Sequence, residues 1–242
     1  SALGVFNGLL ASIYLLFLNK KKRLPNYFLG LLILMLSIRI GKSVYLIFNK
    51  EDVLLFLQIG LSACFLIGVM LMYYIKASVN LVKKVPLLWK VHISLLLLFV
   101  IGVGIYKPYK YNPVFWGDYF IDFIYLVWGV YITLTAIDLK SILLKFFKRK
   151  KECTTAELWL LVVYLANILI FIGYVVGRMQ FYIVGTLIFS LVMYLLIFFL
   201  LFKKNREGIF KDVPEKYGAK KIHVTEADAL FIRLQNLMIN DS

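Results

Sequence analysis

Four charged residues stand inside otherwise apolar stretches of this chain, and they are its best candidates for chemistry. Arg39 and Lys42 are three residues apart, and Asp118 and Asp122 are four apart. Each pair would share one face of a helix at that spacing. A charge inside hydrocarbon is costly unless it is paired or hydrated. The sequence therefore predicts either a buried ion-pair network or a polar cavity.

Two amide side chains extend this predicted cluster. Gln58 and Asn167 fall in two further apolar stretches, at similar depth when counted at ~1.5 Å per helical residue. In one interpretation, Arg39 or Lys42 pairs with Asp122 and the amides bond across helices, which fixes the bundle without a ligand. In the other, the two cations face an outward cavity that receives an anionic or zwitterionic ligand. The sequence leaves both interpretations open.

Residues for catalysis are scarce, so we expect neither an enzyme nor a cofactor. The histidines are His92, at the start of an apolar stretch, and His223, in the polar tail, which is too few for a catalytic metal centre. No Gly-x-Ser-x-Gly turn accompanies them. A retinal pigment needs a Lys in its last span, and none lies between Arg178 and Lys203.

Seven apolar segments must position these residues. They cover residues 3–18, 27–48, 53–75, 87–105, 116–137, 158–176 and 181–202. Most reach the ~20 residues that a helix needs to cross the hydrocarbon core. The expected fold is an all-α seven-transmembrane helix bundle over residues 1–203, with a cytoplasmic linker and signalling helix over 204–242.

The Lys and Arg content of the loops predicts the orientation of this bundle. The loops after the first, third, fifth and seventh segments are rich in basic residues, whereas the others hold only Lys50, Lys107, Lys110 and Arg178. Basic residues resist translocation, so the rich loops belong in the cytoplasm, with the N-terminus outside and the C-terminus inside. The net charge of +15 then reflects orientation and lipid contact more than nucleic-acid binding.

Aromatic residues crowd the longest outward loop, residues 106–117. Tyr109, Tyr111 and Trp116 lie in this loop or at its end, and Arg178 and Tyr182 flank the last outward hairpin. Such residues commonly anchor membrane proteins at the interface. They could equally form a rim over the predicted cavity.

The polar tail contains a predicted amphipathic helix. Thr225 is a typical helix cap, and Glu226 and Asp228 follow it in the first turn. Apolar residues then recur at helical spacing, at Leu230, Phe231, Leu234, Leu237 and Met238. A helix this short is marginal alone, so we expect it to dock or to dimerise.

Both ends of the chain resemble bacterial membrane-bound transcriptional regulators of the AraC type (AraC/XylS). The tail is similar to their connector, in which a Lys-Tyr pair, here Lys216-Tyr217, precedes a capped helix that leads into a helix-turn-helix domain. The first two segments are similar to the family's run "N..LG.lLl.l..r..k". The matching positions are Asn26, Leu29, Gly30, Arg39 and Lys42. The middle of the chain agrees only in hydropathy and span count.

This resemblance implies the sensor part of a transcriptional regulator in the bacterial cytoplasmic (inner) membrane. It implies a homodimer, with DNA bound through a domain that would begin where this chain stops, at Ser242. A small-molecule or lipid ligand would act by binding two arrangements of the bundle with different affinity. The alternatives are a small-solute transporter or channel that uses the same polar cluster, and a structural subunit without a ligand.

Overall fold

The computed structural model describes residues 2–18, 23–48, 53–148, 153–179, 188 and 191. Every regular element among them is a helix, and five helices are long and apolar enough to cross a membrane. They are α2 (Leu24–Phe48), α3 (Val53–Val79), α4 (Leu87–Tyr106), α7 (Thr155–Met179), and the continuous pair η2 (Phe115–Phe120) and α5 (Ile121–Asp138). These helices confirm the second to sixth apolar segments and fit a multi-pass membrane protein.

The first and last predicted segments have different outcomes. The first is a shorter apolar helix, α1 (Ala2–Ile13), continued by the π-helical turns of η1 (Tyr14–Leu18). The last segment lies outside the described residues except for Ile188 and Leu191, and the tail with its signalling helix lies outside them entirely. The count of seven spans and the orientation remain predictions.

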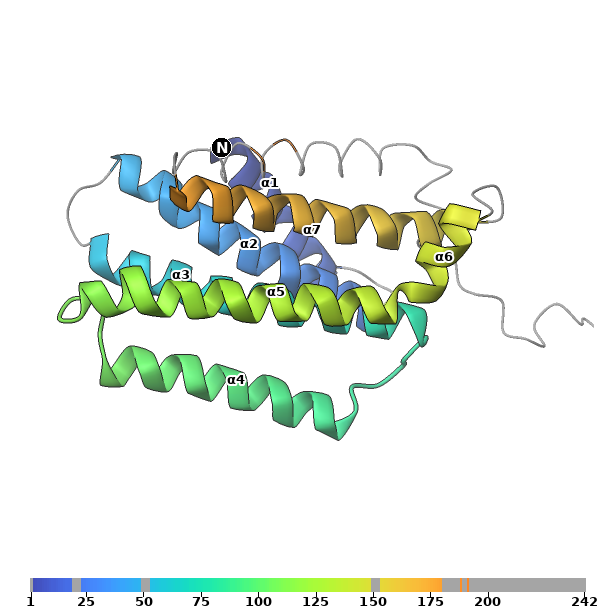
Figure 1. Ribbon diagram of the computed structural model, residues 1–242, viewed down its shortest axis with the longest axis horizontal. Coiled ribbons are helices and arrows are strands. Elements are labelled where there is room, and N and C mark those ends of the chain that lie inside the picture. Colours follow the sequence, from blue (N-terminus) through green and yellow to red (C-terminus); the bar gives the residue numbers. More distant parts are fainter. Residues whose placement is uncertain are drawn as a thin grey trace, which may run out of the picture.

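Helix α3 is the centre of the bundle. It packs along α2 on one side and α5 on another, while α1 and η1 pack on α2 and α7 packs on α5 and α3. Figure 1 shows the long helices running roughly alongside one another, with α4 at one edge. α3 is predominantly apolar along its length, as expected of a helix with neighbours on several sides.

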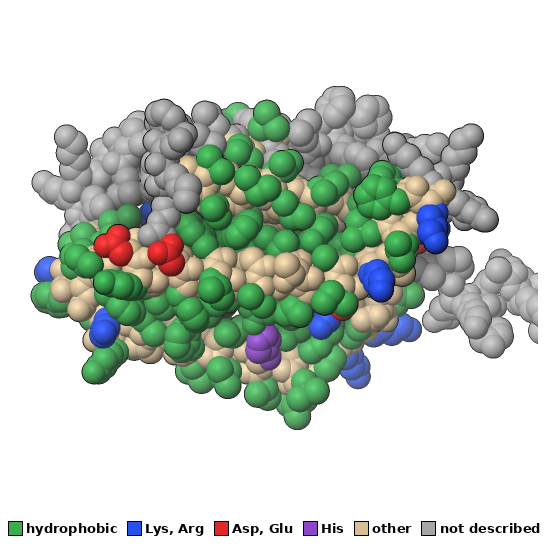
Figure 2. Space-filling view, viewed as in Figure 1, with side chains coloured by type: hydrophobic (Ala, Val, Ile, Leu, Met, Phe, Trp, Pro, Cys, Tyr) green, Lys and Arg blue, Asp and Glu red, His purple; other side chains and the backbone are tan. Residues whose placement is uncertain are grey.

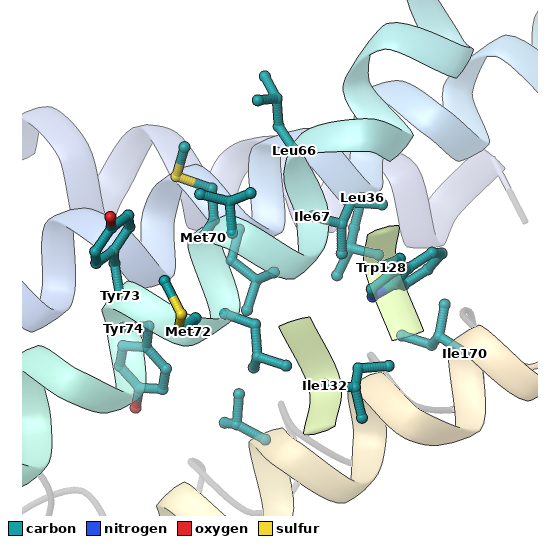
Figure 3. Close-up of a cluster of buried hydrophobic side chains, with 14 of the residues drawn as sticks. Leu36, Leu66, Ile67, Met70, Met72, Tyr73, Tyr74, Trp128, Ile132 and Ile170 are labelled. Carbon is teal, nitrogen blue, oxygen red and sulfur yellow. The ribbon is translucent and has the colours of Figure 1, made fainter. Parts of the chain in front are cut away.

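Side chains of α2, α5 and α7 pack around α3 to form the core. Figure 3 shows Leu36 of α2 and Ile67 of α3 close to Trp128 of α5, with Ile170 of α7 completing the group. Each of these four side chains is buried. Lipid tails are as apolar as these residues, so the gain comes from close van der Waals packing rather than from leaving water.

A short helix that the sequence analysis treated as loop follows α5. α6 (Lys140–Lys148) is amphipathic and buries Ile142. Lys145 Nζ lies 2.8 Å from Glu157 Oε2 at the start of α7. Glu157 also closes a capping box, because its carboxylate accepts from Thr154 N at 2.7 Å and its own N–H donates to Thr154 Oγ1 at 3.2 Å. These contacts tie α6 to the start of α7.

The close approach of α3 and α5 depends on Gly68. A Cβ at Gly68 would lie 2.9 Å from Tyr131 Cβ and 3.3 Å from Trp128 Cα. The second of these is a backbone atom, so α5 itself would have to move. By contrast, a Cβ at Gly102 on α4 would meet nothing within 4 Å.

We predict that Gly68→Ala destabilises the bundle by about 1–3 kcal/mol through this overpacking. Gly102→Ala, the matched control, should be neutral or slightly stabilising, because alanine favours a helix over glycine by about 1 kcal/mol. Reversible unfolding in mixed micelles measures both. Equal effects of the two substitutions would contradict the close approach.

Candidate functional site

Both cations of α2 point into the bundle. Arg39 is 2% exposed and Lys42 is 6% exposed. The guanidinium carbon of Arg39 lies 4.8 Å from the centre of the Tyr174 ring on α7, a cation–π contact. The stem of Lys42 passes over Gly60 on α3, where an added Cβ would lie 2.6 Å from Lys42 Cδ. Glycine at position 60 therefore makes the room that the lysine stem occupies.

A thiol lies beside the two cations. Cys64 of α3 is fully buried. The positive charges of Arg39 and Lys42 both act on this thiol. We call Arg39, Lys42, Cys64 and Tyr174 the buried cation site. Like charges repel each other in a medium of low dielectric constant, so a negative group near both cations would be stabilised there.

Asn167 connects to this site through an aromatic pair. Trp128 Nε1 donates to Asn167 Oδ1 at 3.0 Å, and both residues are buried. The Trp128 ring lies 6.2 Å from the Tyr174 ring, which carries Arg39 on its face. The amide Nδ2 of Asn167 has no hydrogen-bond acceptor among the described residues. Helices α2, α5 and α7 thus meet in one polar-aromatic chain.

Gln58 bonds backbone groups at the end of α4 and in the loop after it. Its Nε2 donates to Gly104 O at 3.1 Å, and its Oε1 accepts from Tyr109 N at 2.9 Å. Both partners belong to the end of α4 or the loop after it. Gln58 therefore ties α3 to this loop.

The acidic candidates and the aromatic rim spread over one end of the bundle. Asp118 and Asp122 are exposed, and Figure 2 shows acidic side chains on the surface near the η2 end of α5. Tyr111 is exposed, whereas Trp116 is buried and donates Nε1 to Lys107 O at 2.6 Å. The side chain of Arg178 and all of Tyr182 lie outside the described part.

Three residues of this region were missed by the sequence analysis. Cys64, Trp128 and Tyr174 carry no charge, and each occupies an apolar segment where hydropathy alone gives it no distinction. Their proximity to Arg39 becomes apparent only when α2, α3, α5 and α7 are assembled. Among the described residues, no group of three or more His, Cys, Asp and Glu could hold a metal ion.

We predict that Asn167→Leu destabilises the bundle by about 1–3 kcal/mol, because it leaves the buried Trp128 N–H without its acceptor. Asn112→Leu is the matched control. It removes the same amide from the loop after α4, where the side chain only donates to Pro108 O at 3.3 Å. Thermal unfolding in detergent measures both. A control that costs as much as Asn167→Leu would refute the proposed role of the Trp128 bond.

Comparison of the whole chain with protein-family models, with curated proteins and with solved structures finds no match in any of the three.

Proposed function

We propose that this chain is the transmembrane sensor of a bacterial membrane-bound regulator of the AraC type. In this proposal an anionic group that reaches Arg39 and Lys42 biases the packing of the bundle, and the tail passes the change to a DNA-binding domain. The observation that carries the proposal is the burial of both cations where α2, α3 and α7 meet.

The physical argument starts from the cost of these charges. Ionisable residues inside a membrane bundle are expensive and mark functional sites more often than ordinary packing. An apolar residue of similar size at position 39 or 42 would fill the space at lower cost. A ligand that binds one arrangement of the site better than another shifts the population between them.

The described contacts supply a route from the site to α7. Arg39 lies over Tyr174, and the Tyr174 ring is next to Trp128. Trp128 in turn bonds Asn167, which precedes Tyr174 by seven residues, or about two turns, on α7. A displacement of α2 would therefore move α7, which precedes the last predicted segment and the tail. A coupling of about 1–3 kcal/mol would change the output about 5- to 150-fold.

The identity of the output rests on the tail. The Lys216-Tyr217 pair, the Thr225 cap and the apolar stripe from Leu230 to Met238 resemble the connector of AraC-type regulators. Paired half-sites on DNA favour a two-fold symmetric reader, which supports a homodimer. We also propose that the chain lies in the bacterial inner membrane, with its N-terminus outside and its tail in the cytoplasm.

A transporter or channel is the alternative function for the same residues. Carriers commonly bind their substrate where spanning helices are broken. Here α2, α3 and α7 are continuous through Arg39, Cys64 and Tyr174. Continuous helices at the buried cation site favour a sensor over a carrier.

A reporter assay separates sensing from a purely structural role. A DNA-binding domain that requires dimerisation is placed after Ser242, and reporter output and thermal stability are both measured. Arg39→Met and Lys42→Met should each leave the melting temperature nearly unchanged, since methionine keeps apolar volume at either position and removes a charge that is costly inside a membrane bundle. Each should change the output by at least about fivefold.

The matched control for this assay is Lys110→Met, which removes a positive charge from an exposed position. It should alter neither quantity. The proposal fails if the Arg39 and Lys42 variants unfold at much lower temperature, which is the result that a structural ion network predicts. It also fails if both variants are stable and their output equals that of the unaltered chain.

A further inference from the structure

Helix α4 stands apart from the bundle. Only 11% of its apolar window is buried, compared with 61% for α3. Figure 1 shows α4 at the edge, with its ribbon separated from α5 along its length. Long side chains cross this separation at two levels. The Phe99 ring reaches Phe65 of α3 at 5.8 Å and Phe123 of α5 at 6.1 Å, and His92 reaches both helices through tyrosines.

A groove of about 590 Å³ lies between these helices. Its volume is in the range of about 300–1,000 Å³ that is typical of small-molecule sites. One part of its lining is polar, with Lys76, His92 and Tyr131, and the remainder is apolar and includes Leu95 and Val127. Figure 2 shows this face, on which hydrophobic side chains dominate and a histidine lies among them. The groove is therefore amphipathic.

The tyrosines around His92 leave a proton donor at the groove. Tyr73 Oη lies 2.6 Å from His92 Nδ1, and Tyr131 Oη lies 2.9 Å from His92 Nε2. A neutral imidazole offers one donor and one acceptor, so only one hydroxyl can donate to it. When the imidazole proton is on Nε2, Tyr73 donates to Nδ1, while Tyr131 accepts from the ring and keeps its own O–H for another acceptor.

Lys76 adds positive charge at the same polar end. Its Nζ lies 3.8 Å from Asp138 Oδ2, a long ion pair, and an ammonium has three protons to donate. Lys76 stands in the last turn of α3, and His92 stands near the start of α4. The polar end is thus close to the ends of the spans, at the depth where lipid headgroups lie.

From these observations we propose that the groove binds an anionic lipid of the surrounding membrane. One hydrocarbon chain lies along Leu95, Phe99 and Val127, and the headgroup phosphate accepts hydrogen bonds from Lys76 and Tyr131. The groove shares no residue with the buried cation site, so this binding site stands whether or not the chain is a sensor. A bound lipid fills the separation between α4 and α5 and fixes the position of α4.

Photo-cross-linking of the intact chain tests this proposal. The chain is placed in nanodiscs of phosphatidylcholine that contain a trace of phosphatidylglycerol with a diazirine in one acyl chain. A parallel sample contains phosphatidylcholine with the same diazirine chain. The phosphatidylglycerol probe should label the groove-facing residues of α4 and α5 several-fold more than the phosphatidylcholine probe.

Two matched substitutions on α4 locate the site. Leu95 lines the groove and is 60% exposed, whereas Leu98 is 70% exposed and does not line it. Leu95→Trp should fill the groove and reduce its labelling several-fold, and Leu98→Trp should not. Tyr131→Phe, which removes only the hydroxyl, should reduce the preference for phosphatidylglycerol.

Three results would overturn the proposal. The first is equal labelling by the two probes, which would mean an ordinary lipid-facing surface. The second is groove labelling that Leu95→Trp and Leu98→Trp reduce equally. The third is labelling spread evenly along the exposed face of α4. Both leucines are largely exposed, so neither substitution threatens the fold.

Discussion

The cost of holding positive charge inside an apolar bundle governs the arrangement around α2. Arg39 and Lys42 are buried, so their surroundings must offset the loss of hydration. The face of the Tyr174 ring offsets this loss for the guanidinium of Arg39, and Gly60 leaves space for the stem of Lys42. These requirements set how α2 rotates against α3 and α7. A change in the charge near the site would therefore change the preferred packing of three helices.

The two candidate sites lie in different parts of the bundle. The buried cation site lies inside the bundle, where desolvation makes any negative partner matter strongly. The groove beside α4 lies at the edge, where Lys76 and Tyr131 sit near the end of the spans and the rest of the lining is apolar. Helix α3 contributes residues to both. Because α3 is central, it lines both the buried cation site and the groove beside α4.

Hydropathy predicted the five long helices well, because a span requires a minimum run of apolar residues whatever it packs against. The sequence also predicted that Arg39 and Lys42 would need either ion-pair partners or a polar cavity, but not the aromatic ring of Tyr174. Sequence could not say which helices become neighbours, since packing between apolar helices leaves little trace in composition. Trp128 and Tyr174 were missed for that reason. α6 was missed because its amphipathic run is short and its contacts, such as Lys145 with Glu157, are tertiary.

The polar residues that the sequence singled out do not all make the same kind of contact. Asn167 joins the buried site through Trp128, whereas Gln58 ties the loop after α4 to α3. Asp118 and Asp122 are exposed. Depth along a helix can be counted from sequence, but the direction in which a residue faces depends on how the helix rotates in the bundle. An amide or carboxylate at the right depth is therefore compatible with several roles.

The most direct test of the account is the reactivity of Cys64, which lies beside both cations. In a Cys153→Ser chain, Cys64 is the remaining cysteine. Intact cells are treated with membrane-impermeant methanethiosulfonates of opposite charge. If the buried cation site opens outward to anions, the negatively charged reagent should react faster, because the cations concentrate it locally, and Arg39→Met should abolish the difference. Equal rates for the two reagents, or reaction only after unfolding, would contradict the account.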